Sequence, residues 1–103
     1  MAKILTDAVK VKNAVLIHSQ EDSFSHYDDI YELQHYETII LKVRNREIKE
    51  IRPVSHSSIR AINQALEYLG LNTTVKELKK NPLVQVVYKY WIAKNANFAV
   101  KNY

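Results

Sequence analysis

The chain has 103 residues, of which 47% are hydrophobic, and a formal net charge of +4. This length is sufficient for one hydrophobic core but too short for a core with a separate catalytic lobe, so we expect a single domain over residues 1–103. Cysteine is absent, which excludes disulfides, thiol catalysis and thiolate metal sites and is typical of a reducing compartment. Charged residues interrupt the first 17 positions, so we predict neither a signal peptide nor a membrane span and expect a cytoplasmic protein.

The two parts of the chain differ in charge. Residues 1–54 contain eight Lys or Arg and nine Asp or Glu, a net charge of −1, whereas residues 55–103 contain seven and two, a net charge of +5. Residues 18–37 contain six acidic and no basic side chains, and residues 42–52 contain five basic and two acidic ones. Such segregation suits a polyanion, an acidic protein partner or self-association, and equally the solvated faces of an ordinary small domain.

The N-terminal part predicts β-structure interrupted by a polar segment. Residues 9–17 are rich in β-branched side chains and contain an apolar run of the length of a buried strand. Residues 18–29 are polar, with little to bury, which predicts a loop. Residues 28–33 fit both a short strand and one helical turn, and both interpretations stay open.

The clearest strand signal lies over residues 39–43, where one face is apolar and the other becomes charged. Asn45-Arg46 then predicts a tight hairpin turn, because asparagine readily takes the left-handed conformation. The partner strand over residues 47–54 breaks strict alternation, which indicates a bulge. Pro53 restricts that strand to a sheet edge or ends it.

An amphipathic helix follows these strands. Ser57 or Ser58 is a suitable N-cap, and apolar side chains then recur every three or four positions up to Leu69. Gly70, the one glycine of the chain, ends the helix because a residue without Cβ enters the left-handed region at no steric cost.

Two further helices are expected in the last third of the chain. Thr74 and Glu77 form a capping box at the start of a short helix. Asn81-Pro82 combines a good cap residue with proline at the first helical position, which predicts a third helix. Residues 83–93 also fit a strand, but we favour the helix because of this start and of the Ala and Lys content that follows.

These elements predict an α+β fold. An N-terminal antiparallel sheet of three to four strands over residues 1–54 packs against a C-terminal helical half of two to three helices over residues 55–103. The expected core residues are Ile39, Leu41, Val43, Ile62, Leu66, Leu69, Leu83 and Val87.

The leading functional hypothesis is non-catalytic binding of DNA or RNA by two groups of basic side chains. Outward residues of a two-stranded ribbon share a face, so the basic hairpin is suited to follow a phosphate backbone, and further lysines line the second helix. The predicted nucleic-acid-binding residues are Lys42, Arg44, Arg46, Lys49, Lys76, Lys79 and Lys80. In the alternative interpretation these charges only solubilise a sheet face and a helix edge.

The helices around Gly70 also have the outline of a helix-turn-helix, with residues 72–80 as the recognition helix. Pro82 stops this helix after about two turns. A helical hairpin with a solvated lysine edge explains the same residues, and we favour it over a helix-turn-helix that reads DNA.

A second hypothesis is a protein-interaction module or inhibitor that presents an acidic surface to a basic partner, with a homodimer as one form. The candidate partner-binding residues are Glu21, Asp22, Asp28, Asp29 and Tyr31. Exposed tyrosines would anchor such a contact.

A third and least favoured hypothesis is a small metal-dependent nuclease. Asp28 or Asp29, followed by Glu47-Ile-Lys49, has the order in which two carboxylates hold a divalent metal and a lysine stabilises developing charge. Side chains of metal-binding types also occur in the polar segment, at His18, Glu21, Asp22, His26 and Asp28. A polar loop explains these residues better, so we predict no catalytic residue, metal or cofactor.

Tyr36-Glu-Thr38, the charged hairpin and Pro53-Val-Ser55-His-Ser-Ser58 ahead of a helix resemble a short domain of unknown function that recurs in phage, plasmid and archaeal proteins. Ser57 and Ser58 stand where that pattern has threonines, and a following histidine is missing. The resemblance implies no activity. It implies a viral or mobile-element accessory protein, located in the host cell, and such proteins often bind nucleic acid or obstruct a host protein.

Overall fold

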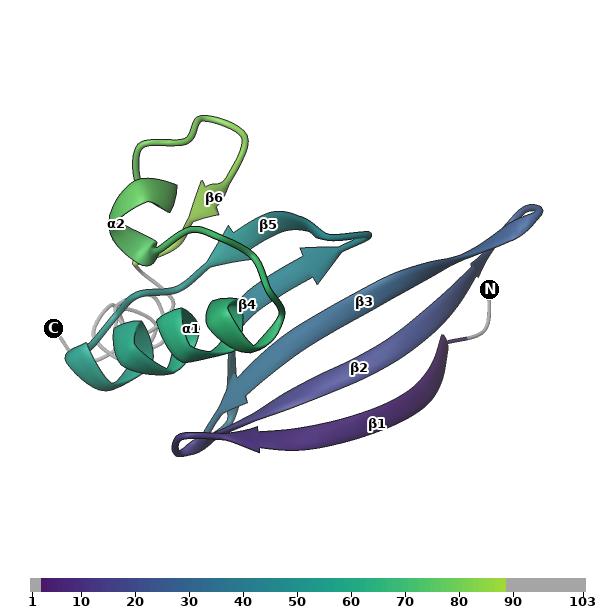
Figure 1. The fold of residues 1–103 in the computed structure, drawn as a ribbon, viewed down its shortest axis with the longest axis horizontal. Helices are drawn as coiled ribbons and strands as arrows, with labels where there is room; N and C mark the ends of the chain where they lie inside the picture. The colour runs from purple at the N-terminus through teal and green to yellow at the C-terminus, as the bar shows by residue number, and fades with distance from the viewer. Residues whose placement is uncertain (1–2, 89–103) are drawn as a thin grey trace, which may run out of the picture.

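The computed structural model describes residues 3–88, which form a β-meander, a helical segment and a short last strand (Figure 1). Six strands make one sheet in the order β1-β2-β3-β4-β5-β6. Neighbouring strands are antiparallel from β1 to β5, and β6 pairs with β5 in parallel. The strands are β1 (Lys3–Val11), β2 (Ala14–Ser23), β3 (His26–His35), β4 (Thr38–Arg44), β5 (Glu47–Ile51) and β6 (Gln85–Val86), and the helices are α1 (His56–Tyr68) and α2 (Val75–Leu78).

The strands β2 and β3 extend well beyond the part of the sheet that α1 covers (Figure 1). α1 lies at the end of the sheet that holds the β1–β2 and β3–β4 turns, which we call the proximal end. The β2–β3 turn lies at the opposite end (Figure 1). We call residues 18–31, which contain that turn, the distal hairpin.

The predicted C-terminal helical half and the predicted three-to-four-stranded sheet are wrong. Among the described residues α1 is the one helix of seven residues or more, since α2 has four, and the sheet has six strands. Instead of a third helix, residues 82–88 contain β6, where Val87 N donates to Ile51 O at 2.9 Å. β-branched side chains favour this extension of the sheet over a helix. Residues 89–93 of the ambiguous stretch lie outside the described residues.

The interpretation of residues 9–17 as one strand is wrong, because the chain reverses at Lys12-Asn13 and β1 pairs with β2. The predicted loop over residues 18–29 is wrong as well, since it completes β2 and, after Phe24-Ser25, begins β3. Residues 28–33 are therefore strand. Lys12 and Phe24 have φ values of 59° and 50°, which non-glycine residues seldom adopt, so the usual turn signals are missing from the sequence.

The strand predicted over residues 39–43 is confirmed as part of β4. The turn that follows is confirmed too, with φ values of 50° at Asn45 and 65° at Arg46. β5 carries the expected bulge, at Lys49. It ends two residues before Pro53, but it is not a sheet edge because β6 pairs with it.

The hydrophobic core lies between the proximal end of the sheet and the two helices. Its buried residues are Val11, Ala14, Leu16, Leu33, Ile40, Leu41, Val43, Ile51, Ala61, Ile62, Ala65, Leu66, Val75, Leu78 and Val84. The predicted core residues Leu41, Val43, Ile62 and Leu66 are thus confirmed, and Leu69 packs against the cluster.

Three of the predicted core residues are not part of this cluster. A bulge in β4 places Ile40 rather than Ile39 beside Leu41 in the core. Leu83 is 85% exposed, because the helix that would have turned it inward does not form. Val87 is half-buried and lies outside the cluster.

α1 begins two or three residues earlier than an N-cap at Ser57 or Ser58 predicts. Ser55 is the N-cap: its Oγ accepts from Ser58 N at 3.1 Å, while Ser58 Oγ accepts from Ser55 N at 2.9 Å. The helix ends as predicted at Gly70, which has a φ of 71°. Leu71 N then donates back to the last turn of α1.

α2 begins as predicted at Thr74, whose hydroxyl accepts from Glu77 N at 3.4 Å, but it ends at Leu78. One turn is too short for a recognition helix, which removes the helix-turn-helix interpretation. Within residues 3–88 no helix has both the length and the apolar character needed to cross a membrane.

Candidate functional site

The predicted basic hairpin holds its central charge in ion pairs with the acidic segment. Nη2 of Arg44 lies 2.8 Å from Glu21 Oε1 and 2.7 Å from Asp28 Oδ2. Asn45 Nδ2 also donates to Asp28, at 2.8 Å. Strand pairing has therefore joined two groups of residues that we predicted as separate binding sites, one basic and one acidic.

Lys49 and Lys42 also face acidic residues. Lys49 Nζ lies 2.6 Å from Glu47 Oε1. In the strand register Lys42 lies opposite Glu32 of β3 and Glu50 of β5. Positive and negative side chains thus alternate across β3, β4 and β5, and this alternation reduces the attraction of the surface for a polyanion.

The other predicted basic residues are exposed and come from separate segments. Arg46 lies in the β4–β5 turn, Lys76 on α2 and Lys80 just after it. Lys79 Nζ lies 5.6 Å from the centre of the Tyr88 ring, a cation–π distance. The seven predicted residues are therefore spread over β4, its turn, β5 and the α2 segment.

Two predicted partner-binding carboxylates are engaged within the fold. Hydrogen bonds from Asn45 and then Arg44 lower the pKa of Asp28 below its ordinary value of 3.8. His18 Nε2 lies 3.0 Å from Asp29 Oδ1, and this hydrogen bond lowers the pKa of Asp29. Both carboxylates are therefore charged at neutral pH and already have partners.

Tyr31 and Asp22 have different surroundings. Asp22 is exposed near the end of β2. Tyr31 is half-buried, and its ring stacks on the imidazole of His18 with centroids 4.2 Å apart and planes 7° from parallel. Burial, followed by the charges of Asp29 and Asp7, raises the pKa of the Tyr31 phenol above 10.0. The phenol is therefore neutral at physiological pH.

The residues of the nuclease hypothesis also have partners in the structure. Asp28 binds Arg44, and Glu47 binds Lys49, a contact that lowers the pKa of Glu47. Across residues 3–88 no three His, Asp or Glu side chains come together as a group that would hold a metal ion. The predicted metal-binding residues His18, Glu21, Asp22, His26 and Asp28 form no such group.

A hollow at the proximal end brings together basic residues that no sequence motif marks. It has a volume of about 290 Å³ and is lined by Lys12, Asn13, Ser57 and Arg60. Asn13 Nδ2 donates to Ser57 Oγ at 3.0 Å, and His35 Nε2 lies 3.2 Å from the same hydroxyl. These bonds hold the β1–β2 turn against the first turn of α1, and so keep Lys12 and Arg60 at one site.

A second hollow, of about 270 Å³, continues along α1 and is lined by Lys10, Val11, Lys12, Gln64 and Tyr68. It shares Lys12 with the first hollow. We call the two together the α1 groove, with Lys10–Asn13 on one wall and Ser57, Arg60, Gln64 and Tyr68 on the other. These four helix residues recur every three or four positions and so occupy one side of α1.

The cations of the α1 groove differ from Arg44 and Lys49 of the basic hairpin, which are ion-paired. Lys10, Lys12 and Arg60 have no ion-pair partner within residues 3–88. Among the described residues no acidic side chain lines either hollow, and Glu67, the one carboxylate in the sequence of α1, is not part of the lining. Like charges around a concave surface reinforce one another and raise the local concentration of anions.

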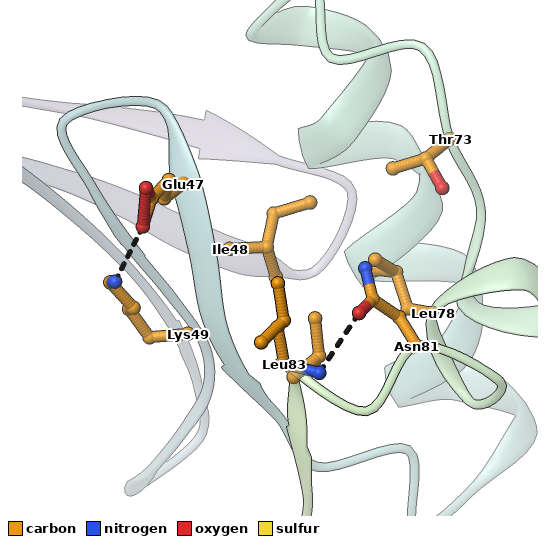
Figure 2. A pocket seen from close by; sticks show the side chains of 8 residues that line it. Glu47, Ile48, Lys49, Thr73, Leu78, Asn81 and Leu83 are labelled. Atoms are coloured by element: carbon orange, nitrogen blue, oxygen red, sulfur yellow. Dashed lines mark hydrogen bonds and ion pairs between the residues drawn. The ribbon is translucent and has the colours of Figure 1, made fainter.

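A third hollow, of about 430 Å³, lies between β5 and the α2 segment (Figure 2). Ile48 and Leu83 give it an apolar side, and Lys49 is bound to Glu47 at its β5 rim (Figure 2). Asn81 Oδ1 accepts from Leu83 N at 2.9 Å. The lysine of this hollow is thus neutralised, in contrast to the cations of the α1 groove.

The α1 groove leaves no joint signal in the sequence because its two walls come from distant segments, 10–13 and 57–68. Lys10 and Lys12 beside a turn, and Arg60 on the polar side of a helix, are each typical of a solvated surface. Only the packing of α1 against the β1–β2 hairpin places them together.

No family model, curated protein or solved structure matches this chain. The resemblance of residues 36–58 to a phage, plasmid and archaeal domain therefore stays a prediction. The geometry and charge of the described residues are the basis for the function proposed below.

Proposed function

We propose that this chain is a non-catalytic nucleic-acid-binding protein that holds a phosphate backbone in the α1 groove. The supporting observation is that Lys10, Lys12 and Arg60 line two hollows that share Lys12, and that no acidic side chain is among the described residues of the lining. The guanidinium of Arg60 offers paired donors that match a phosphate, and the lysines act as mobile point charges. Asn13 and Gln64 add uncharged hydrogen-bonding groups of the kind that contact phosphate and sugar.

The distribution of acidic side chains supports this orientation of the partner. The β2–β3 turn lies at the opposite end of the sheet from α1 (Figure 1), and Asp22 is next to this turn in the strand register. A polyanion is therefore attracted to the proximal end and repelled from the exposed distal carboxylate of Asp22. The proposed binding site is therefore the α1 groove instead of the basic hairpin, and the proposed partner is still nucleic acid.

The first prediction concerns a variant that removes two cations of the groove, Lys12→Asn with Arg60→Gln. Asparagine suits the positive φ of position 12, so the turn is retained. We expect the variant to bind a fluorescein-labelled oligonucleotide about tenfold more weakly, and the slope of log affinity against log salt to fall by about two. Fluorescence anisotropy titrations between about 50 and about 200 mM salt measure both quantities.

The matched control is Lys42→Gln with Lys49→Gln, which removes the same net charge from the alternating surface and the ion-paired hairpin. We expect this control to bind within about twofold of the unmodified protein, because Lys49 is ion-paired with Glu47 and Lys42 lies between Glu32 and Glu50 in the strand register. Equal weakening by both variants would show that net charge alone matters. Absence of binding by the unmodified protein at low salt would refute the proposal.

A second candidate function, contact with a protein partner, is favoured by the tip of the distal hairpin. Phe24 in the turn is fully exposed, and Tyr27 beside it is 56% exposed. Exposed aromatic side chains are common anchors of protein interfaces. Pull-down with the unmodified chain and with Phe24→Ser, Tyr27→Ser tests this candidate: a specific partner that the variant fails to capture supports it, and a partner that the variant retains contradicts it.

A further inference from the structure

We infer that the α1 groove binds single-stranded rather than double-stranded nucleic acid, with one base stacked on Tyr68. This inference rests on the proposed function and names its substrate class. Tyr68 is 58% exposed, although it lines the same hollow as Lys10 and Lys12. An aromatic ring beside unpaired cations is the combination with which proteins hold single strands, since the ring stacks a base while the cations bind phosphates.

The shape of the groove favours one strand. Its helix wall runs from Ser57 to Tyr68, a length of about 16 Å along the helix axis, which accommodates a few nucleotides. A duplex presents a convex surface with its bases stacked inside, so a duplex phosphate row would leave the Tyr68 ring without a base to contact. A single strand places phosphates and unstacked bases side by side along the same path.

The charges near Tyr68 differ from those in the rest of the groove. Tyr68 contributes to the raised pKa of the Tyr31 phenol, after burial, the charges of Asp29 and Asp7, and the opposing charge of Arg46. The surroundings of Tyr31 therefore contain charges of both signs, whereas the charged residues that line the groove are Lys10, Lys12 and Arg60. The Tyr31 ring is itself covered by His18, which leaves Tyr68 as the accessible ring of this group.

Gln64, one helical turn before Tyr68, lies between the cations and the aromatic ring. Its amide has both a donor and an acceptor, so it matches the edge of a base held against Tyr68. The order along the groove is therefore Arg60 and Lys12 for phosphate, Gln64 for a base edge, and Tyr68 for stacking. The hollow between β5 and the α2 segment differs, because the residues described in its lining include no aromatic ring and its lysine is ion-paired.

The test uses the full chain and four labelled probes: a twelve-nucleotide DNA strand of mixed sequence, the same sequence as RNA, the DNA duplex, and an abasic strand of equal length. We expect tighter binding of both single strands than of the duplex. Tyr68→Ala should weaken single-strand binding by about fivefold to about one hundredfold, the loss associated with one stacked base. Tyr68→Phe should bind within about twofold of the unmodified protein because it keeps the ring.

Three further results separate this inference from the proposed function. Tyr68→Ala should leave both the affinity for the abasic strand and the salt slope unchanged, because the ring contacts bases and not phosphates. If Tyr68→Ala binds every probe normally while Lys12→Asn with Arg60→Gln weakens binding, the stacking inference fails and the proposed function stands. If neither variant has an effect, both fail. The exposed ring is not part of the core, so circular dichroism should show an unchanged fold for Tyr68→Ala.

Discussion

The β2–β3 hairpin is stabilised in two different ways along its length. At the proximal end Leu16 and Leu33 are almost completely buried in the core under the helices. In the distal hairpin the same strands are joined by polar contacts, such as His18 with Asp29, and Arg44 of β4 forms ion pairs with both Glu21 of β2 and Asp28 of β3. A polar stretch can therefore form regular strands where each charged side chain finds a partner on the neighbouring strand.

The two ends of the sheet also differ in whether their cations have acidic partners. The distal hairpin contains several carboxylates, and two of them form ion pairs with Arg44 of the adjacent strand. The proximal end has the core on one side and a nearly acid-free helix on the other, so Lys12 and Arg60 stay unpaired within residues 3–88. The number of basic residues in a segment is thus a poor guide to its electrostatic potential, which depends on the neighbours that the fold supplies.

The largest expected effect is the loss of stability caused by Leu33→Ala at the proximal end. Leu33 has no exposed surface, so its truncation leaves a cavity under α1 and lowers the free energy of unfolding by about 2–5 kcal/mol. Urea unfolding followed by circular dichroism measures this loss. The control Leu83→Ala, at a residue that is 85% exposed, should change the free energy by less than about 0.5 kcal/mol. Similar losses in the two variants would show that burial does not distinguish these sites.

A smaller and regional effect is expected from Arg44→Met. Methionine keeps much of the apolar stem but removes the guanidinium, which leaves Glu21 and Asp28 without their cation. We expect faster amide hydrogen exchange over residues 20–29 and unchanged exchange around Leu33. Lys42→Met is the matched control, because Lys42 lies on the same strand and has no ion-pair partner within residues 3–88. Loss of protection at both ends would mean that the two ends unfold as one unit.

The smallest effect is expected from acidification below pH 3.8. The pKa values of Asp28 and Asp29 in the folded protein lie below 3.8, so the folded state binds these protons less tightly than the unfolded chain does. Their contribution to stability is therefore complete above pH 3.8 and is lost as the pH falls through the lower folded values. Amide NMR spectra recorded on acidification should broaden or shift in the distal hairpin before the proximal end changes.

The variant Asp28→Asn with Asp29→Asn tests the cause of this acid response. It should show the loosened distal hairpin already at neutral pH and little further regional change on acidification. If the proximal signals of the unmodified protein change first, these two carboxylates do not determine the acid response.

Features that depend on neighbouring residues in the chain were predictable. The alternation over residues 39–43, the left-handed turn at Asn45 and the end of α1 at Gly70 all appear in the structure as expected. Each depends on interactions within a few residues, so local sequence specifies it. Thr74 likewise caps α2, although the helix stops after four residues.

The missed elements depend on residues far apart in the chain. The strands on both sides of Phe24-Ser25 lack an apolar pattern, and their polar side chains become stable only in contact with β4 and with each other. Turns such as Lys12-Asn13 use positive φ without glycine, which only a surrounding sheet compensates. The short β6 forms because β5 offers an unpaired edge, a feature that its own residues do not encode.

The candidate site divides in the same way. The excess of positive charge, the amphipathic helix and the charged hairpin can be recognised from the amino-acid sequence, because composition and period are local properties. Which cations are neutralised and which can bind an anion depends on the fold. Arg44 forms ion pairs with Glu21 and Asp28 on two other strands, while Lys12 and Arg60 line the same hollow. Coulomb interactions depend on distance in space, and that distance is set by the fold.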